Sequence, residues 1–159
     1  MSRSDSSGPR LSLAVQYASD APDLPARAQI RRWIQNALSH SAEITVRFVD
    51  EIEARALNRD YRDKDYATNV LTFDYSEPEP GAERKIISGD IVICAAVVAR
   101  EAAEQHKLLI DHYAHLIIHG VLHLRGFDHE DPADADIMET HEAAILKRFR
   151  ITNPYLSDI

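Results

Sequence analysis

The chain has 159 residues, 45% of them hydrophobic, which is enough for one compact domain with a real core and too little for two of ordinary size. Its 26 acidic and 18 basic residues give a formal charge of −8, so any nucleic acid must be held by a local basic cluster. The single cysteine, Cys94, excludes an intramolecular disulfide, and the longest apolar run, residues 91–99, is too short to span a membrane.

From these features we expect a cytoplasmic protein with no membrane partner. Residues 1–10, MSRSDSSGPR, contain no apolar stretch of the kind found in signal peptides and are expected to be a disordered tail. Residues 11–159 are then expected to form a single domain.

Hydrophobic periodicity predicts four strands and five helices. Apolar residues alternate or are β-branched in the strands and recur on one face in the helices, as Ile52, Ala56 and Leu57 do in the second helix. Because the strands come early and the helices late, the pattern indicates an α+β domain with a four-stranded mixed β-sheet packed against about five helices. The expected strands are 11–17, 43–50, 69–75 and 86–95, and the expected helices are 25–40, 51–62, 95–105, 108–125 and 134–149.

The segment HGVLHLRGFDH, residues 119–129, carries three histidines. His119 and His123 share one face of a helix, with Cβ atoms about 6 Å apart, so both can reach one cation. Gly126 falls where that helix should end and favours a left-handed cap, which would bring His129 back toward the other two. Three nitrogen ligands with a fourth position left to water are typical of catalytic zinc, whereas structural zinc usually has four protein ligands rich in cysteine.

A helical histidine pair alone more often serves packing or lies on the surface than binds a metal. The spacing HxxxHxxGxxH, however, is that of the metal ligands and glycine in the metzincin proteases. We therefore predict a zinc-metalloprotease-like metal site made of His119, His123 and His129. His115 lies one turn earlier on the same face, where it either supports the site, lines its pocket or is simply a partly exposed helical histidine.

The proteases with this spacing place a glutamate, their general base, directly after the first histidine, and this chain has Gly120 there. The likeness is therefore one of ligand geometry and not of mechanism, although a bound metal would still lower the pKa of bound water toward about 7. Asp128, beside the third predicted ligand, could act as a base, support a ligand or belong to a solvated acidic loop.

A second segment, LNRDYRDKDYATNVLTF at residues 57–73, places Arg59, Arg62 and Lys64 between a helix end and a strand. Because arginine offers a bidentate fork to phosphate oxygens, this loop is a candidate phosphate clamp. The alternative is a solvated helix C-terminus, whose dipole the same cations complement. If a nucleic acid binds, the cations that face the metal cleft should be found among Arg59, Arg62, Lys64, Arg84, Lys85 and Arg125.

Together with SGDIVIC between them, these two segments resemble the YbeY family of bacterial rRNA maturation factors, from about residue 11 to 150. The resemblance implies a metal-dependent endoribonuclease specific for single strands, with zinc or a related divalent metal on His119, His123 and His129 and a functionally important Arg62. It further implies action on rRNA precursors, especially the 3′ end of the small-subunit 16S rRNA, and a role in ribosome quality control. The implied partners are small-subunit ribosomal proteins or a ribosome-associated GTPase.

Our first hypothesis is accordingly an endoribonuclease that acts on single-stranded RNA and not on DNA. Arg62 would bind the scissile phosphate and stabilise the charge of its transition state, and the nucleophile would be metal hydroxide or the adjacent ribose 2′-hydroxyl. The alternatives are another metal-dependent hydrolase or metalloprotease, and a non-enzymatic, metal-containing ribosome-assembly factor. The candidate catalytic residues are Arg62 and His119, and the candidate substrate-binding residues are Arg59, Lys64, His115 and Asp128.

Overall fold

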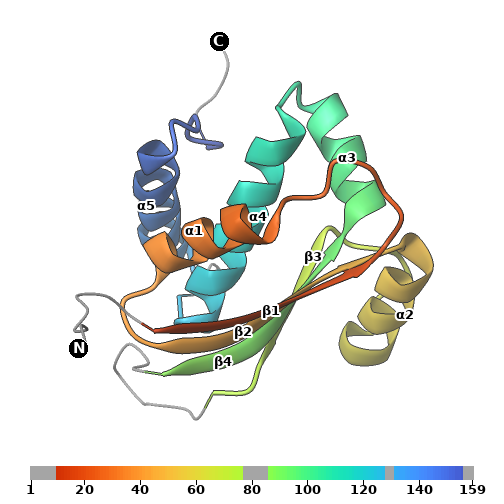
Figure 1. The fold of residues 1–159 in the computed structure, drawn as a ribbon, viewed down its shortest axis with the longest axis horizontal. Helices are drawn as coiled ribbons and strands as arrows, with labels where there is room; N and C mark the ends of the chain where they lie inside the picture. Colours follow the sequence, from red (N-terminus) through yellow and green to blue (C-terminus); the bar gives the residue numbers. More distant parts are fainter. Residues whose placement is uncertain (1–9, 77–85, 128–130, 156–159) are drawn as a thin grey trace.

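The computed structural model describes residues 10–76, 86–127 and 131–155, which form a four-stranded sheet and five helices (Figure 1). The predicted α+β class, the mixed sheet and the element order are confirmed. The elements are β1 (Leu11–Ala18), α1 (Arg27–Ala37), β2 (Ala42–Val49), α2 (Glu51–Arg62), β3 (Val70–Asp74), β4 (Ile87–Cys94), α3 (Ala95–Glu104), α4 (Leu109–Leu124) and α5 (Pro132–Arg148). The expected tail 1–10 falls almost entirely outside the described residues.

The strand order in the sheet is β1-β2-β4-β3. β1, β2 and β4 are parallel, with Val46 of β2 opposite Val15 of β1 and Ile91 of β4. β3 runs antiparallel to β4, with Thr72 opposite Ile91, and forms one edge of the sheet. Among the described residues, the short strand β3 is therefore an outer edge of the sheet, and the candidate site lies along it.

Two hydrophobic clusters lie on opposite faces of the sheet. On β4, Ile91 and Ile93 belong to the larger cluster, and the alternate residues Val92 and Cys94 belong to the smaller one. The larger cluster packs α1, α4 and α5 onto the sheet, and the smaller one packs α2 and the first turn of α3. Because β4 is buried on both faces at this end, its sequence reads as a continuous apolar run.

Helix α4 is the centre of the helical layer. It contacts α1, α3 and α5 as well as β3 and β4, and Figure 1 shows it between α5 and α3. A helix surrounded in this way is apolar on nearly every side. Within the described ranges, no helix is both long and apolar enough to cross a membrane.

The inward face predicted for α2 is partly wrong. Ile52 is 87% exposed, whereas the buried residues of this helix are Ala54 and Asn58. The buried Asn58 donates a hydrogen bond through Nδ2 to the carbonyl of Tyr66 at 2.8 Å, which fixes the helix against the loop that follows it. The face of α2 that packs on the sheet is thus centred on Ala54 and Asn58, and Ile52 lies on the opposite side.

Candidate functional site

Three histidines form a stripe along α4, which we call the histidine stripe: His115, His119 and His123. From residue 112 to residue 124, every residue of the helix is buried except these three, which are partly exposed. Their spacing of four residues places them on one face, as predicted. The central helix of the core therefore reaches solvent along this segment only through imidazole rings.

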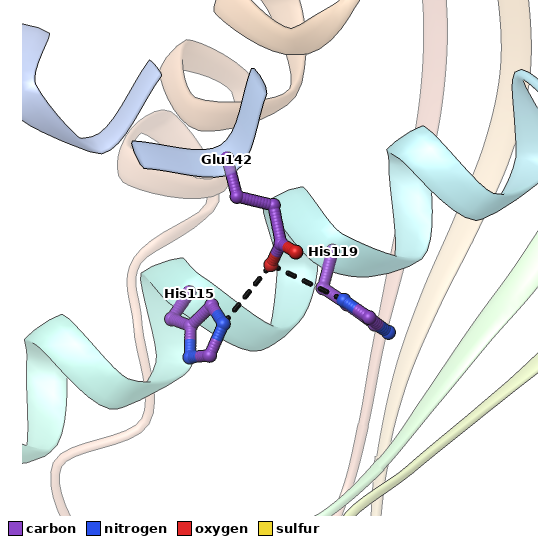
Figure 2. Close-up of side chains that lie close together, drawn as sticks. All are labelled: His115, His119 and Glu142. Atoms are coloured by element: carbon purple, nitrogen blue, oxygen red, sulfur yellow. Dashed lines mark hydrogen bonds and ion pairs between the residues drawn. The ribbon is translucent and has the colours of Figure 1, made fainter. Parts of the chain in front are cut away.

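The carboxylate of Glu142, on α5, lies between two of these histidines (Figure 2). His115 Nε2 donates to Glu142 Oε2 at 3.0 Å, and His119 Nδ1 donates to the same oxygen at 3.2 Å. The hydroxyl of Tyr155 donates to the other oxygen, Oε1, at 2.9 Å. Glu142 has no exposed surface, so this buried charge is held entirely by hydrogen bonds from neighbouring side chains.

The histidine contacts keep Glu142 ionised. Burial raises the pKa of the Glu142 carboxyl, but the hydrogen bonds from His115 and His119, together with the charges of the two rings, outweigh it and bring the pKa to about 2. Burial, and then the neighbouring Glu142 charge, raise the pKa of the Tyr155 hydroxyl, which therefore stays a hydrogen-bond donor. The cluster is thus a carboxylate surrounded by three donors.

The same contacts assign the proton positions on two rings. His115 Nδ1 is buried and has no hydrogen-bond partner among the described residues, so a proton there would be an unsatisfied donor. In the neutral His115 ring the proton is therefore on Nε2, which bonds Glu142. His119 donates through Nδ1, so in the neutral ring Nε2 carries the lone pair, and Figure 2 shows Nε2 pointing away from Glu142.

The described residues could hold a divalent metal in two ways that share His119. In the first, His115, His119 and Glu142 offer ligand atoms that all lie within 4.8 Å of one another. In the second, His119 uses Nε2 together with His123, as predicted from the sequence. Both sets consist of the nitrogen and oxygen donors that zinc and related divalent metals accept. The predicted third ligand, His129, and Asp128 lie outside the described residues.

The turn that follows α4 has the predicted form. Gly126 has a φ of 106°, its N–H donates to the carbonyl of His123 at 3.0 Å, and the N–H of Phe127 donates to that of Leu122 at 3.1 Å. These paired bonds are a Schellman motif, which satisfies the last carbonyls of a helix and reverses the chain. The reversal needed to return toward His119 and His123 therefore begins where the sequence predicted it.

Gly120 lies on the side of α4 that packs against the sheet. A Cβ at this position would meet Ile91 Cδ1 at 3.1 Å and Thr72 Cγ2 at 3.2 Å. A side chain at residue 120 would thus point into the packing between α4 and the sheet. The glutamate of the protease motif could consequently not be accommodated at residue 120, because its carboxylate would be buried against apolar groups.

A cleft of about 360 Å³ runs along the β3 edge of the sheet. Arg62, the last residue of α2, lines it on one side, and His123 of α4 lines it as well. Within the described part of the chain, the guanidinium of Arg62 makes no ion pair or hydrogen bond, whereas Arg55 on the same helix pairs with Asp65 at 2.7 Å. The structure thus brings the predicted arginine and a predicted metal ligand to one cavity. Its lining residues are Tyr61, Arg62, Leu71, Thr72, Phe73, Asp74, Tyr75 and His123.

The other predicted substrate-binding residues lie elsewhere. Arg59 and Lys64 are exposed and are not among the described residues that line this cleft. His115 lines a different cavity of about 350 Å³, near the N-terminal end of α4. Arg125 donates to the carbonyl of Ala37 at 2.8 Å and packs over a ring, so it stabilises the fold. Arg84 and Lys85 lie outside the described residues.

Glu142 and Tyr155 are the residues that sequence reasoning missed. Glu142 had a detectable signal, because Met138, Glu142 and Leu146 recur every four residues and all three are buried. A charged residue at a core position of a helix needs a partner, and this pattern could have marked it as part of a site. Tyr155 follows the last helix and carries no comparable local signal.

A family model described as Endoribonuclease YbeY matches residues 16–150. A protein of Thiobacillus denitrificans named Endoribonuclease YbeY is 65% identical over 149 residues, which cover 94% of this chain and 99% of that protein. A protein of the same name from Methylobacillus flagellatus is 51% identical over 150 residues, 94% of this chain and 97% of that protein. The solution structure of TM1509 from Thermotoga maritima shares the fold, with a TM-score of 0.53 at 20% identity over 90% of this chain and 99% of that one. The chain therefore belongs to the endoribonuclease YbeY family.

Proposed function

We propose that the protein is a metal-dependent endoribonuclease that cleaves single-stranded RNA, with rRNA precursors as substrate and the 3′ end of the small-subunit 16S rRNA as the target. The observation that carries this proposal is the edge cleft, in which Arg62 and His123 line one cavity. The names of the relatives support the reaction class. The cytoplasmic location and the partners, small-subunit ribosomal proteins or a GTPase, belong to the same proposal.

Arg62 binds the scissile phosphate in this proposal. Its guanidinium stands in the cleft without a carboxylate partner among the described residues, so its charge is available to an anion. A planar guanidinium contacts two phosphate oxygens at once and stabilises the charge that develops on them in the transition state. The local cation also explains how an acidic chain holds RNA.

The metal would be held by His119 Nε2, His123 and His129, and we propose zinc. When bound, it supplies Lewis-acid chemistry at the phosphate. Glu142 positions His119, since its hydrogen bond to Nδ1 fixes the ring orientation and directs Nε2 away from the carboxylate. We favour this set over His115, His119 and Glu142 because catalysis requires a ligand position open to substrate, and Glu142 is wholly buried.

The first test measures metal content and cleavage together. Wild-type protein is reconstituted with Zn²⁺, its metal is measured by elemental analysis, and cleavage is followed on a labelled single-stranded RNA from a small-subunit rRNA precursor and on the same RNA as a duplex. We expect one metal per chain and cleavage of the single strand only. Absence of cleavage by the metal-loaded protein would refute the proposal.

The second test decides between the two ligand sets. His123→Ala should lose both metal and cleavage, whereas His115→Ala should keep the metal. The opposite result, metal retained in His123→Ala and lost in His115→Ala, would assign the ion to His115, His119 and Glu142. RNA with a 2′-deoxy group at the scissile position then identifies the nucleophile, because it blocks attack by the ribose hydroxyl and leaves hydrolysis by water possible.

A further inference from the structure

We propose that Tyr61 and Tyr75 form a nucleobase-stacking subsite on the edge cleft, on which unpaired bases next to the phosphate held by Arg62 stack. This inference rests on the proposed function, because it takes single-stranded RNA as the occupant. It adds a subsite for the bases to the site that holds the phosphate, and it gives a physical reason for selecting single strands.

Tyr61 is an exposed aromatic side chain held in a fixed orientation. It is 69% exposed, yet its ring meets the ring of Phe73 edge to face, with centroids 5.2 Å apart and an angle of 77°. It directly precedes Arg62 at the end of α2, and Phe73 is itself packed on the smaller hydrophobic cluster. The ring therefore has a rigid support on one side and solvent on the other.

Tyr75 is fixed in a comparable way on the strand side of the cleft. It is 62% exposed, its N–H donates to the carbonyl of Ser88 at 2.8 Å, and its hydroxyl donates to Asp90 Oδ2 at 3.0 Å. Tyr75 and Phe73 are two residues apart, so they lie on the same face of the β3 segment. Two exposed tyrosine rings are thus held in fixed orientations at the sheet edge, although neither ring is buried in the hydrophobic core.

The composition of the cleft favours a nucleobase over other occupants. Two exposed aromatic rings beside an arginine combine stacking surfaces with a phosphate contact, which is how single-stranded nucleic acids are bound. In a duplex the bases are stacked on one another, so only an unpaired strand could use these rings.

The test compares RNA with and without bases. Binding of a fluorescent single-stranded RNA is measured by anisotropy for wild type, Tyr61→Ala, Tyr61→Phe, Tyr75→Ala and Tyr66→Ala, and is repeated with an abasic RNA that keeps the same phosphates. Tyr66 is the matched control, since it is 54% exposed in the loop after α2 but does not line the cleft. A gel after each titration verifies that the probe is intact.

We expect Tyr61→Ala and Tyr75→Ala to raise the Kd for base-bearing RNA by about five-fold to about a hundred-fold, the range that corresponds to loss of one stacked base. Tyr61→Phe and Tyr66→Ala should keep the wild-type Kd for base-bearing RNA. Every variant should keep the wild-type Kd for abasic RNA. Equal losses on abasic and base-bearing RNA, or no loss in either alanine variant, would overturn the subsite.

Failure of the subsite and failure of the proposed function give different results. If wild type binds RNA with the expected dependence on bases but never cleaves it, only the proposed nuclease activity is refuted. If wild type cleaves RNA while both tyrosine variants keep its Kd and KM, only the stacking subsite is refuted.

Discussion

The two ends of the histidine stripe have opposite surroundings. At one end, His115 is bonded to a wholly buried carboxylate that also receives the hydroxyl of Tyr155. At the other end, His123 lines an open cleft together with Arg62. At the first end, which we call the filled end, protein side chains satisfy both oxygens of the Glu142 carboxylate. The second end, which we call the open end, lines the cleft. One helix thus carries both the histidines that are bonded to Glu142 and the histidine that lines the cleft with Arg62.

Reversing the charge at the open end should have the largest effect. We expect Arg62→Glu to lower kcat/KM for single-stranded RNA by about a thousand-fold, near the upper range for loss of one transition-state donor, because the new charge also repels phosphate. Elemental analysis should find the metal content unchanged. The control is Arg32→Glu, an equal change of charge on α1; a comparable loss of activity in that variant would mean that Arg62 acts only through net charge.

A glutamate at residue 120 should disrupt the packing of α4 against the sheet between the two ends of the histidine stripe. Gly120→Glu would bury a carboxylate against Ile91 and Thr72, so we expect the free energy of unfolding to fall by about 3 kcal/mol or more, as measured by urea denaturation. The variant should not gain turnover of a peptide library. A variant of wild-type stability that cleaves peptides would revive the protease alternative.

Lowering the pH should weaken the filled end, because it protonates the Glu142 carboxylate. The pKa of Glu142 is lowered from 4.5 to about 2, so its contribution to stability is complete above pH 4.5 and is lost as the pH falls toward 2. This contribution is about 3 kcal/mol, since one pKa unit corresponds to about 1.4 kcal/mol. Unfolding of wild type and Glu142→Gln is compared across this range in chelator. Parallel curves would show that Glu142 carries no such linkage.

The same variant tests whether the filled end orients the metal ligand. Glu142→Gln should weaken Zn²⁺ binding by about ten-fold to about a hundred-fold, the usual effect of removing a carboxylate that supports a ligating histidine. Competition with a chromophoric chelator measures this affinity. Unchanged affinity in a folded Glu142→Gln protein would limit Glu142 to a structural role.

The smallest effect is expected at the turn after α4. Gly126→Ala meets no atom within 4 Å, so its only cost is the φ of 106°, about 1–2 kcal/mol of unfolding free energy. Thermal denaturation with and without Zn²⁺ measures it. A destabilisation that appears only in the presence of Zn²⁺ would show that the turn matters for the third ligand and not for the fold itself.

Local patterns explain what could be predicted from the sequence. The four-residue spacing of His119 and His123 and the glycine at residue 126 specify geometry within one or two helical turns, and both predictions are confirmed. The contacts of Glu142 and Tyr155 with His115 join residues 27 and 40 positions apart, so no local periodicity encodes them. Ile52 was misplaced for a related reason, because the buried face of α2 depends on a tether from Asn58 to a later loop.

The burial of α4 also has a consequence for motion. A helix enclosed by three helices and the sheet opens only when the whole domain unfolds, so its amide hydrogens should be among the slowest to exchange. His119 and His123, two of the proposed metal ligands, then project from this enclosed helix. The helix would therefore lose little conformational entropy when a phosphate binds near these histidines. The single strand would have to change its own conformation to reach a productive geometry.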